Sequence, residues 1–411
     1  MRLVSIFPYV YIFAWIFLSF LPYVYYSTKA YVAVLFFLAI TALGYTFYLI
    51  ANYKLIPYFK CVLVFVGLLS IYGLSLIFVG DDVFWKAGNI FVEKNRYMIW
   101  LLISMLSVVP IYIFTCRGEL TEKGMKILFF VMLISSIYAF YVSHQQMMIE
   151  AALLHTEEEE FTITAVYSLL SILPLILLFK RNAILQFVLI FIFFVFFILS
   201  AKRGAILLGS ICILFMIWGI LSNYSIKKKT GFFFISLILL LGLYKFTMFQ
   251  FENSPYFALR YQDTMNGYSS QRDVYLTTIF DYMESNYSVR SFLFGIGAQN
   301  TLKVNVSFAH NDWVAIFLEQ GIFGLMSFIV FWIGFVYTWI ESRSNRVSFV
   351  VIGSLMIIGL GKTMFSMFYL PVTEIMIIAS GFFSIALGYY LGITFPQHGA
   401  DEMKIHRDVV G

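Results

Sequence analysis

Long apolar runs separated by short polar turns dominate the pattern of this 411-residue sequence. About twelve runs approach the length of roughly 20 residues that an α-helix needs to cross a bilayer. They are residues 5–26, 31–50, 61–80, 97–115, 125–143, 161–179, 183–200, 204–222, 231–249, 311–340, 347–369 and 371–393. The pattern predicts an all-α polytopic membrane protein. Very short turns join the first pair and the last pair, so each pair is also compatible with a re-entrant hairpin.

One segment departs from this pattern. Residues 250–310 form the longest polar stretch, and they are rich in Tyr and Phe. Because disordered segments are poor in aromatic residues, we expect one large, ordered external loop. The expected organisation is 1–249 with nine transmembrane helices, 250–310 as a periplasmic loop subdomain, 311–394 with three more helices, and 395–411 as a cytoplasmic tail.

Composition narrows the class of protein further. Hydrophobic residues make up 61% of the chain and charged residues 12%, which excludes a soluble enzyme, a disordered protein and a secreted disulfide scaffold. The net charge of +5 is too small for a nucleic-acid-binding protein. The three cysteines lie far apart, so no disulfide or metal site is expected.

Lys and Arg in the short loops indicate the orientation. With the N-terminus in the cytoplasm, most of these residues fall on the inner side, including the cluster at 226–231, "IKKKTG". Both termini are therefore expected inside and the long loop outside. The acidic run Glu157–Glu160 is then external, either as a solvated patch or as a divalent-cation site.

Lys202 and Arg203 stand between two apolar runs in "LSAKRGAILLG". In the hydrocarbon core each would cost roughly 2.5–3.5 kcal/mol, so they must lie at the interface or face a wet cavity. A basic turn that snorkels to the surface and an anion site at the outer leaflet both fit. Gly204 would allow another group to approach closely.

In the long loop, Ser270 and Asp273 match a capping box, which predicts a helix start. Arg272 falls one turn before an apolar stripe, so it should point toward the bundle, where it could join Arg203. Arg290 follows in the turn after this helix. The stripe consists of Leu276, Ile279, Phe280 and Met283.

Two further segments follow. "FGIGAQN" at 294–300 supplies two glycines for a tight turn. Where the chain re-enters the membrane, Asn311 or Asp312 could cap the next helix, and His310 can exchange a proton near neutral pH. Glu319 lies on nearly the same face as Asp312, and a carboxylate inside a span usually pairs with a cation. The expected partner is Arg203, Lys202 or Lys362.

Together these segments predict several guanidinium groups and one base on the outer face. Guanidinium groups bind phosphate oxygens bidentately and stay charged at physiological pH. No carboxylate pair with metal-binding spacing stands out in this region. The set therefore suits a reaction on a membrane-anchored diphosphate that needs no metal and no cofactor.

The motifs "SAKRGA", "SQRDVY", "FGIGAQN" and "HNDWVAIFLEQGIFGL", spread over 199–328, resemble the O-antigen polymerase and O-antigen ligase superfamily. The resemblance implies a GT-C-like glycosyltransferase of the bacterial inner membrane, whose donor is a glycan on undecaprenyl diphosphate. It implies that Arg203 and Arg272 hold the diphosphate and that His310 serves the acceptor hydroxyl. Lys202 stands where family members often have Ser, so its role is open.

Four functions are compatible with this resemblance and pattern. A polymerase of surface polysaccharide in lipopolysaccharide biosynthesis is favoured by the "HND" start and the Trp after it. A ligase that transfers the glycan to lipid A core is the alternative, and a ligase acting on protein is a further one. A transporter of lipid-linked oligosaccharide should show internal repeats and broken helices. Expected partners are lipid-linked repeat units, the bilayer and a chain-length regulator protein, and Arg290, Lys202, Asn311, Asp312 and Glu319 are the expected substrate-binding residues.

Overall fold

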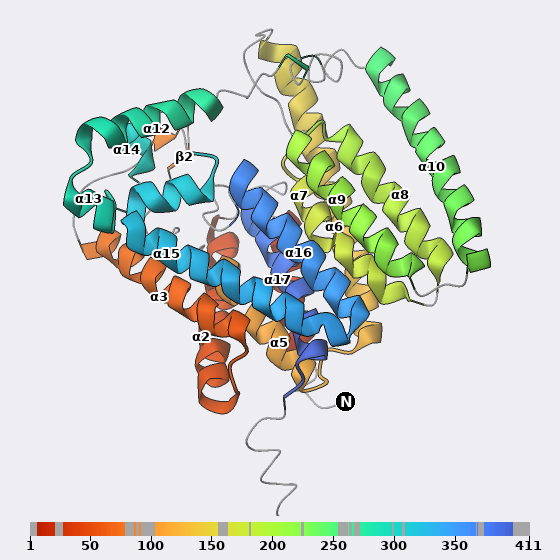
Figure 1. Ribbon diagram of the computed structural model, residues 1–411, viewed down its shortest axis with the longest axis horizontal. Helices are drawn as coiled ribbons and strands as arrows, with labels where there is room; N and C mark the ends of the chain where they lie inside the picture. The colour runs from red at the N-terminus through yellow and green to blue at the C-terminus, as the bar shows by residue number, and fades with distance from the viewer. Residues whose placement is uncertain are drawn as a thin grey trace, which may run out of the picture.

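A computed structural model describes residues 6–20, 28–78, 86–87, 90–91, 103–154, 163–180, 182–222, 226–253, 262, 265–266, 272–297, 300–305, 309–366, 368 and 374–397 (Figure 1). The described chain is helical except for one two-residue antiparallel ladder. In this ladder β1 (Lys86–Ala87) pairs with β2 (Ile90–Phe91). The prediction of an α-helical protein is confirmed, and the small ladder is a feature that the apolar pattern did not indicate.

The helices of the first part of the chain are α1 (Phe7–Phe20), α2 (Thr28–Asn52), α3 (Pro57–Phe78), α5 (Val108–Cys116), α6 (Glu122–Leu154), α7 (Val166–Ile172), the 3-10 helix η3 (Leu173–Phe179), α8 (Ala183–Leu199), α9 (Arg203–Leu221) and α10 (Ile226–Asn253). The later helices are α12 (Arg272–Asn286), α13 (Val289–Phe294), α14 (Thr301–Val304), α15 (Asp312–Glu341), the 3-10 helix η4 (Ser342–Ser344), α16 (Arg346–Phe365) and α17 (Glu374–Thr394). Each predicted apolar segment overlaps a helix.

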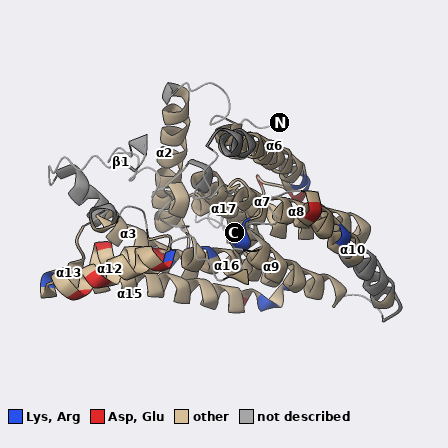
Figure 2. Ribbon diagram, turned by 90° about the horizontal axis from the view of Figure 1, so that it is seen from above, with Lys and Arg blue, Asp and Glu red and all other residues tan. Residues whose placement is uncertain are grey.

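Six helical segments are long and apolar enough to cross a membrane. They are Ala30–Asn52, Glu122–Gln145, Arg203–Leu221, Asp312–Ser344, Arg346–Phe365 and Ile377–Thr394, and five shorter apolar helices accompany them within the described residues. Charged residues in Figure 2 lie mainly at helix ends and on α12 and α13, whereas long stretches of helix carry none. The protein is therefore a multi-pass membrane protein, which matches the prediction at this level.

The bundle is held together by close helix packing rather than by polar contacts. α15 packs along α3, α17 packs on α5 and α7, and α16 packs on α9. Gly361 of α16 lies directly against Leu208 of α9, where a Cβ would overlap that side chain. Small residues let helices approach closely. This matters in lipid because the hydrophobic effect does not drive helices together there, so association depends on close van der Waals packing.

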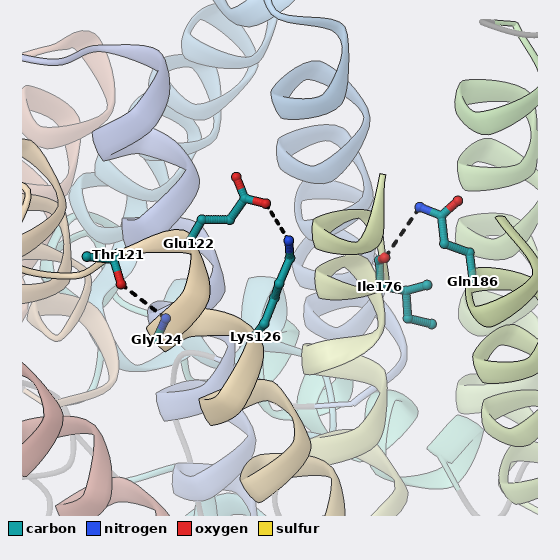
Figure 3. Close-up of polar contacts among 6 residues, drawn as sticks. All are labelled: Thr121, Glu122, Gly124, Lys126, Ile176 and Gln186. Carbon is teal, nitrogen blue, oxygen red and sulfur yellow. Dashed lines mark hydrogen bonds and ion pairs between the residues drawn. The ribbon is translucent and has the colours of Figure 1, made fainter. Parts of the chain in front are cut away.

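A few polar contacts complete the bundle, and Figure 3 shows three of them. Thr121 accepts a hydrogen bond from the backbone N–H of Gly124 at 3.1 Å and so caps α6, and Lys126 pairs with Glu122 at 2.6 Å. The buried side chain of Gln186 in α8 donates to the Ile176 carbonyl in η3 at 3.4 Å. This bond gives the buried amide of Gln186 a backbone partner and joins α8 to η3.

Helix α15 is broken at Gly321, which adopts φ 66° and ψ −161°. The turn 295–297 of the segment 250–310 fills the break. The backbone N–H of Ile296 donates to the Leu318 carbonyl, and that of Gly297 donates to the Glu319 carbonyl, each at 2.9 Å. A Cβ on Gly295 would overlap the backbone of 319–320. The glycine turn predicted for this segment is present, and it anchors the segment 250–310 on α15.

The described part of the segment 250–310 is largely helical. α12 buries Ile279 fully, and Met283 packs partly against the core, but Phe280 is 53% exposed. The predicted stripe thus contacts the bundle at Ile279 and Met283, while Phe280 lies outside this contact. Ser270, the predicted capping residue, lies outside the described residues.

Candidate functional site

The turn between α8 and α9 presents the first cations of the site. Ala201 adopts φ 50° in this turn, and Lys202 and Arg203 are half-buried where α9 begins. A Cβ added to Gly204 would lie 3.1 Å from the hydroxyl oxygen of Tyr167 in α7. The close approach expected at Gly204 is thus made by a tyrosine side chain.

Arg272 opens α12 and points into the bundle, as predicted. Its Nη1 donates a 2.6 Å hydrogen bond to the carbonyl of Phe365, the last residue of α16. Tyr167 interacts electrostatically with Arg272, and its side chain also contacts that of Ser366. Tyr167 is therefore the common neighbour of Arg272 and of Gly204, the residue that follows Arg203 at the start of α9.

The start of α15 is bound to the end of α16. The Oδ1 of Asn311 accepts the backbone N–H groups of Trp313 and Val314 at 2.9 and 3.1 Å, while its Nδ2 donates to the Met364 carbonyl at 3.1 Å. This confirms that Asn311 caps the helix. Asp312 is buried, and its Oδ2 accepts the backbone N–H of Phe368 at 2.9 Å.

His310 lies beside the first turn of α12. It adopts φ 48°, a left-handed conformation that is uncommon for residues other than glycine, and it is half-buried. Its ring stacks on Tyr275, with centroids 6.3 Å apart and planes 29° apart. Because Tyr275 follows Arg272 by one helical turn, the imidazole and the guanidinium belong to the same neighbourhood.

Lys362 is a site residue that the sequence analysis considered only as a partner for Glu319. It lies in the last turn of α16 and is 1% exposed, with Nζ 4.5 Å from the ring centroid of Tyr167 and 4.7 Å from that of Phe368. Its charge interacts with those of Asp312 and Lys202. The signal in the sequence was a single lysine within the apolar run 347–369.

Glu319 is held by Thr301 of the segment 250–310. Its buried carboxylate accepts hydrogen bonds from the Thr301 hydroxyl at 2.7 Å and from the Thr301 backbone N–H at 3.4 Å. The carboxylate therefore holds the start of α14 beside the break in α15. Among the carboxylates that the structure describes, Asp312 rather than Glu319 is the one whose charge acts on Lys362.

Arg290 does not join the other arginines. It is exposed on α13, beyond the far end of α12. The 15 residues of α12 correspond to roughly 20 Å of helix, which separates Arg290 from Arg272. The structure thus gathers Lys202, Arg203, Arg272, His310, Asn311 and Asp312, adds Lys362 and Tyr167, and leaves Arg290 and Glu319 outside this set.

We call the residues Lys202, Arg203, Arg272 and Lys362 the cationic cluster. It lies where α7, α9, α12, α15 and α16 meet, and guanidinium and ammonium groups there can bind the oxygens of an anion. The guanidinium of Arg272 has five N–H donors, and the described part of the chain accepts one of them. The remaining donors can serve a ligand without loss of the anchoring bond.

Glu157–Glu160, the other segment considered for cation binding, lies outside the described residues.

Comparison of the sequence with protein-family models finds no match, and comparison with curated proteins finds no relative.

Proposed function

We propose that this protein is a polymerase of surface polysaccharide that transfers a glycan from undecaprenyl diphosphate to a sugar hydroxyl of another lipid-linked repeat unit. The observation that carries the proposal is that Tyr167 neighbours both Arg272 and Gly204, the residue next to Arg203 at the start of α9. Two guanidinium groups at the end of a membrane bundle suit a lipid-linked diphosphate, and the order of motifs in the sequence points to the same substrate.

The proposed chemistry follows from the charges. When the bond between the sugar C1 and the phosphate oxygen breaks, the leaving diphosphate gains negative charge, and fixed cations there stabilise the transition state. Arg203 and Arg272 would hold the diphosphate. His310, beside Arg272 through Tyr275, would take the proton of the attacking hydroxyl or orient it.

An apolar groove beside the cluster supports a lipid-linked donor. It has a volume of about 310 Å³ and is lined by Trp313 and, from the second half of α15, by Ile329, Trp332, Ile333, Val336, Tyr337 and Ile340. The indole N–H of Trp313 donates to Thr363, one residue after Lys362. A polyprenyl chain in this groove would have its diphosphate end near the cationic cluster.

We further propose about twelve spans in a GT-C-like arrangement in the bacterial inner membrane, with both termini cytoplasmic and the cationic cluster facing the periplasm. Cysteine labelling tests the orientation, with the native cysteines Cys61, Cys116 and Cys212 replaced by Ala. A cysteine at Val289, which is 79% exposed, should react with an impermeant thiol reagent on intact spheroplasts. A cysteine at Ser344, which is exposed at η4, should react only after permeabilisation. The reverse pattern contradicts the orientation.

Deleting the gene and separating the surface polysaccharide on a gel tests the function. Single repeat units on the surface would support a polymerase. Long chains that remain on the lipid carrier would indicate the ligase alternative. Repeat units that never reach the outer face would indicate the transporter, which the broken helix α15 keeps as a second candidate. In α15 the break is filled by the backbone of 296–297, so the carbonyls there are already bonded.

A further inference from the structure

The ammonium group of Lys362 is buried without a hydrogen-bond acceptor in the part of the chain that the structure describes. The rings of Tyr167 and Phe368 contact it at 4.5 and 4.7 Å. Aromatic faces attract a cation, but they offer no acceptor for its three N–H donors. A buried ammonium group in this state is costly, so the site is suited to a ligand that supplies an acceptor.

The surroundings indicate the charge of that ligand. The positive charge of Lys202, in the turn before α9, repels the ammonium group of Lys362, whereas the carboxylate of Asp312 attracts it. Arg272 reaches the other side of Tyr167 and the end of α16. The cations outnumber the carboxylate around Tyr167, so the missing acceptor is expected to be anionic.

We propose that Lys362 binds a phosphate oxygen of the anionic ligand, in a subsite bounded by Tyr167, Phe368 and the start of α9. Arg272 contacts the same ligand from the α12 side. The ammonium contacts both rings, and its flexible four-carbon stem lets it turn toward the phosphate. The identity of the ligand as a lipid-linked diphosphate rests on the proposed function, whereas the phosphate chemistry of the subsite does not.

One competing explanation is that Lys362 only neutralises Asp312. In that case removing both charges together should be harmless, because the buried carboxylate would no longer need its cation. The Oδ1 of an asparagine at 312 can still accept the backbone N–H of Phe368 that Asp312 binds. The double variant Lys362→Met with Asp312→Asn therefore separates ligand binding from charge neutralisation.

The test uses inorganic pyrophosphate as the probe and the purified full-length protein in detergent. Lys362→Met should raise the Kd for pyrophosphate by about tenfold or more, as expected for the loss of a hydrogen bond to a charged group. The double variant should bind pyrophosphate as weakly as the single variant does. Lys245→Met, which removes an exposed lysine of α10, is the matched control and should bind as the wild type does. If Lys362→Met fails to fold, Lys362→Gln replaces it with the same expectations.

Wild-type affinity in the Lys362 variants, recovery of affinity in the double variant, or no pyrophosphate binding by the wild-type protein would each overturn the proposal. Glycan transfer from lipid-linked repeat units is measured separately. Failure of the polymerase assay together with pyrophosphate binding that depends on Lys362 would contradict the proposed function and leave the subsite intact.

Discussion

The side-chain amide of Asn311 joins two helix ends: its oxygen accepts N–H groups of the first turn of α15, and its nitrogen donates to the Met364 carbonyl near the end of α16 at 3.1 Å. One side chain thus sets the position of His310 and Asp312 relative to Lys362. Because both ends of the amide are used, asparagine is the residue type that fits this position best.

Asn311→Asp should separate the two contacts. A carboxylate still accepts the N–H groups of α15, but it cannot donate to Met364 and places negative charge against that carbonyl. Because this contact is exposed to solvent, we expect only a small loss of thermal stability, with loss of most of the polymer in cells. Asn311→Ala, which loses the cap as well, should lower the free energy of unfolding by about 1 kcal/mol. Equal activity of Asn311→Asp and the wild type would show that the amide bridge is not needed.

Replacing arginine by lysine tests the phosphate clamp. Arg272→Lys and Arg203→Lys keep the charge but lose the planar fork, so we expect product formation to fall by about 10²-fold at normal protein level. Arg290→Lys is the matched control, since Arg290 is exposed on α13 away from the cationic cluster, and it should leave the product yield unchanged. Full activity of both clamp variants would reduce these arginines to general positive charge.

His310 variants distinguish a base from an orienting group. His310→Ala should lower kcat by about 10²–10⁴-fold if the imidazole accepts the proton. His310→Gln can hydrogen-bond but cannot accept that proton, so it should be similarly slow. His310→Asn is a useful companion, because Asn tolerates the positive φ of 48° at this position better than most residues. Near wild-type rates for Gln or Asn would contradict base catalysis.

The break in α15 can be tested at glycine. Gly321→Ala should lower the stability by about 1–3 kcal/mol, because its φ and ψ are accessible essentially only to glycine and because a Cβ would overlap the backbone of 293–294. Gly44→Ala is the control: it lies within α2 with open space around it and should be neutral or slightly stabilising. Thermal melting of both purified variants in detergent measures the difference. A Gly321→Ala protein that melts like Gly44→Ala would show that the break is not required.

Chelation tests whether the cationic cluster replaces a metal ion. Four positively charged side chains can neutralise the diphosphate directly, so purified protein with lipid-linked repeat units should keep its activity in excess EDTA. The measurement is the rate of chain extension before and after chelation. Loss of activity that Mg²⁺ or Mn²⁺ restores would mean that the clamp works through a metal ion.

Several positions of the site could be predicted from local sequence because the property in question is local. An asparagine before an apolar run accepts the first N–H groups of the helix, as Asn311 does. Two closely spaced glycines provide positive φ, as at Gly295 and Gly297. Arg272, one turn before an apolar stripe, points to the bundle that the stripe rests on. Each of these follows from the geometry of one or two helical turns.

The partners of buried charges could not be predicted in this way, because they depend on which helices meet. Glu319 was expected to pair with a cation, and the tertiary structure adds a partner that no local pattern indicated: near the bend at Gly321, Thr301 of the segment 250–310 donates to its carboxylate. Arg290 was expected beside the other arginines, but the straight length of α12 carries the following α13 away from them.

The sequence by itself determined that this chain is an α-helical membrane protein with a helix in its longest polar segment and a set of cations near the ends of its apolar runs, since apolar length and helical periodicity are local properties. Only the tertiary structure decided which of these cations meet. The packing of α16 on α9 and the bridge between α15 and α16 bring Lys362, Tyr167 and Arg272 to one place, although they are far apart in the sequence. Such contacts depend on close side-chain packing between helices, which no single segment specifies.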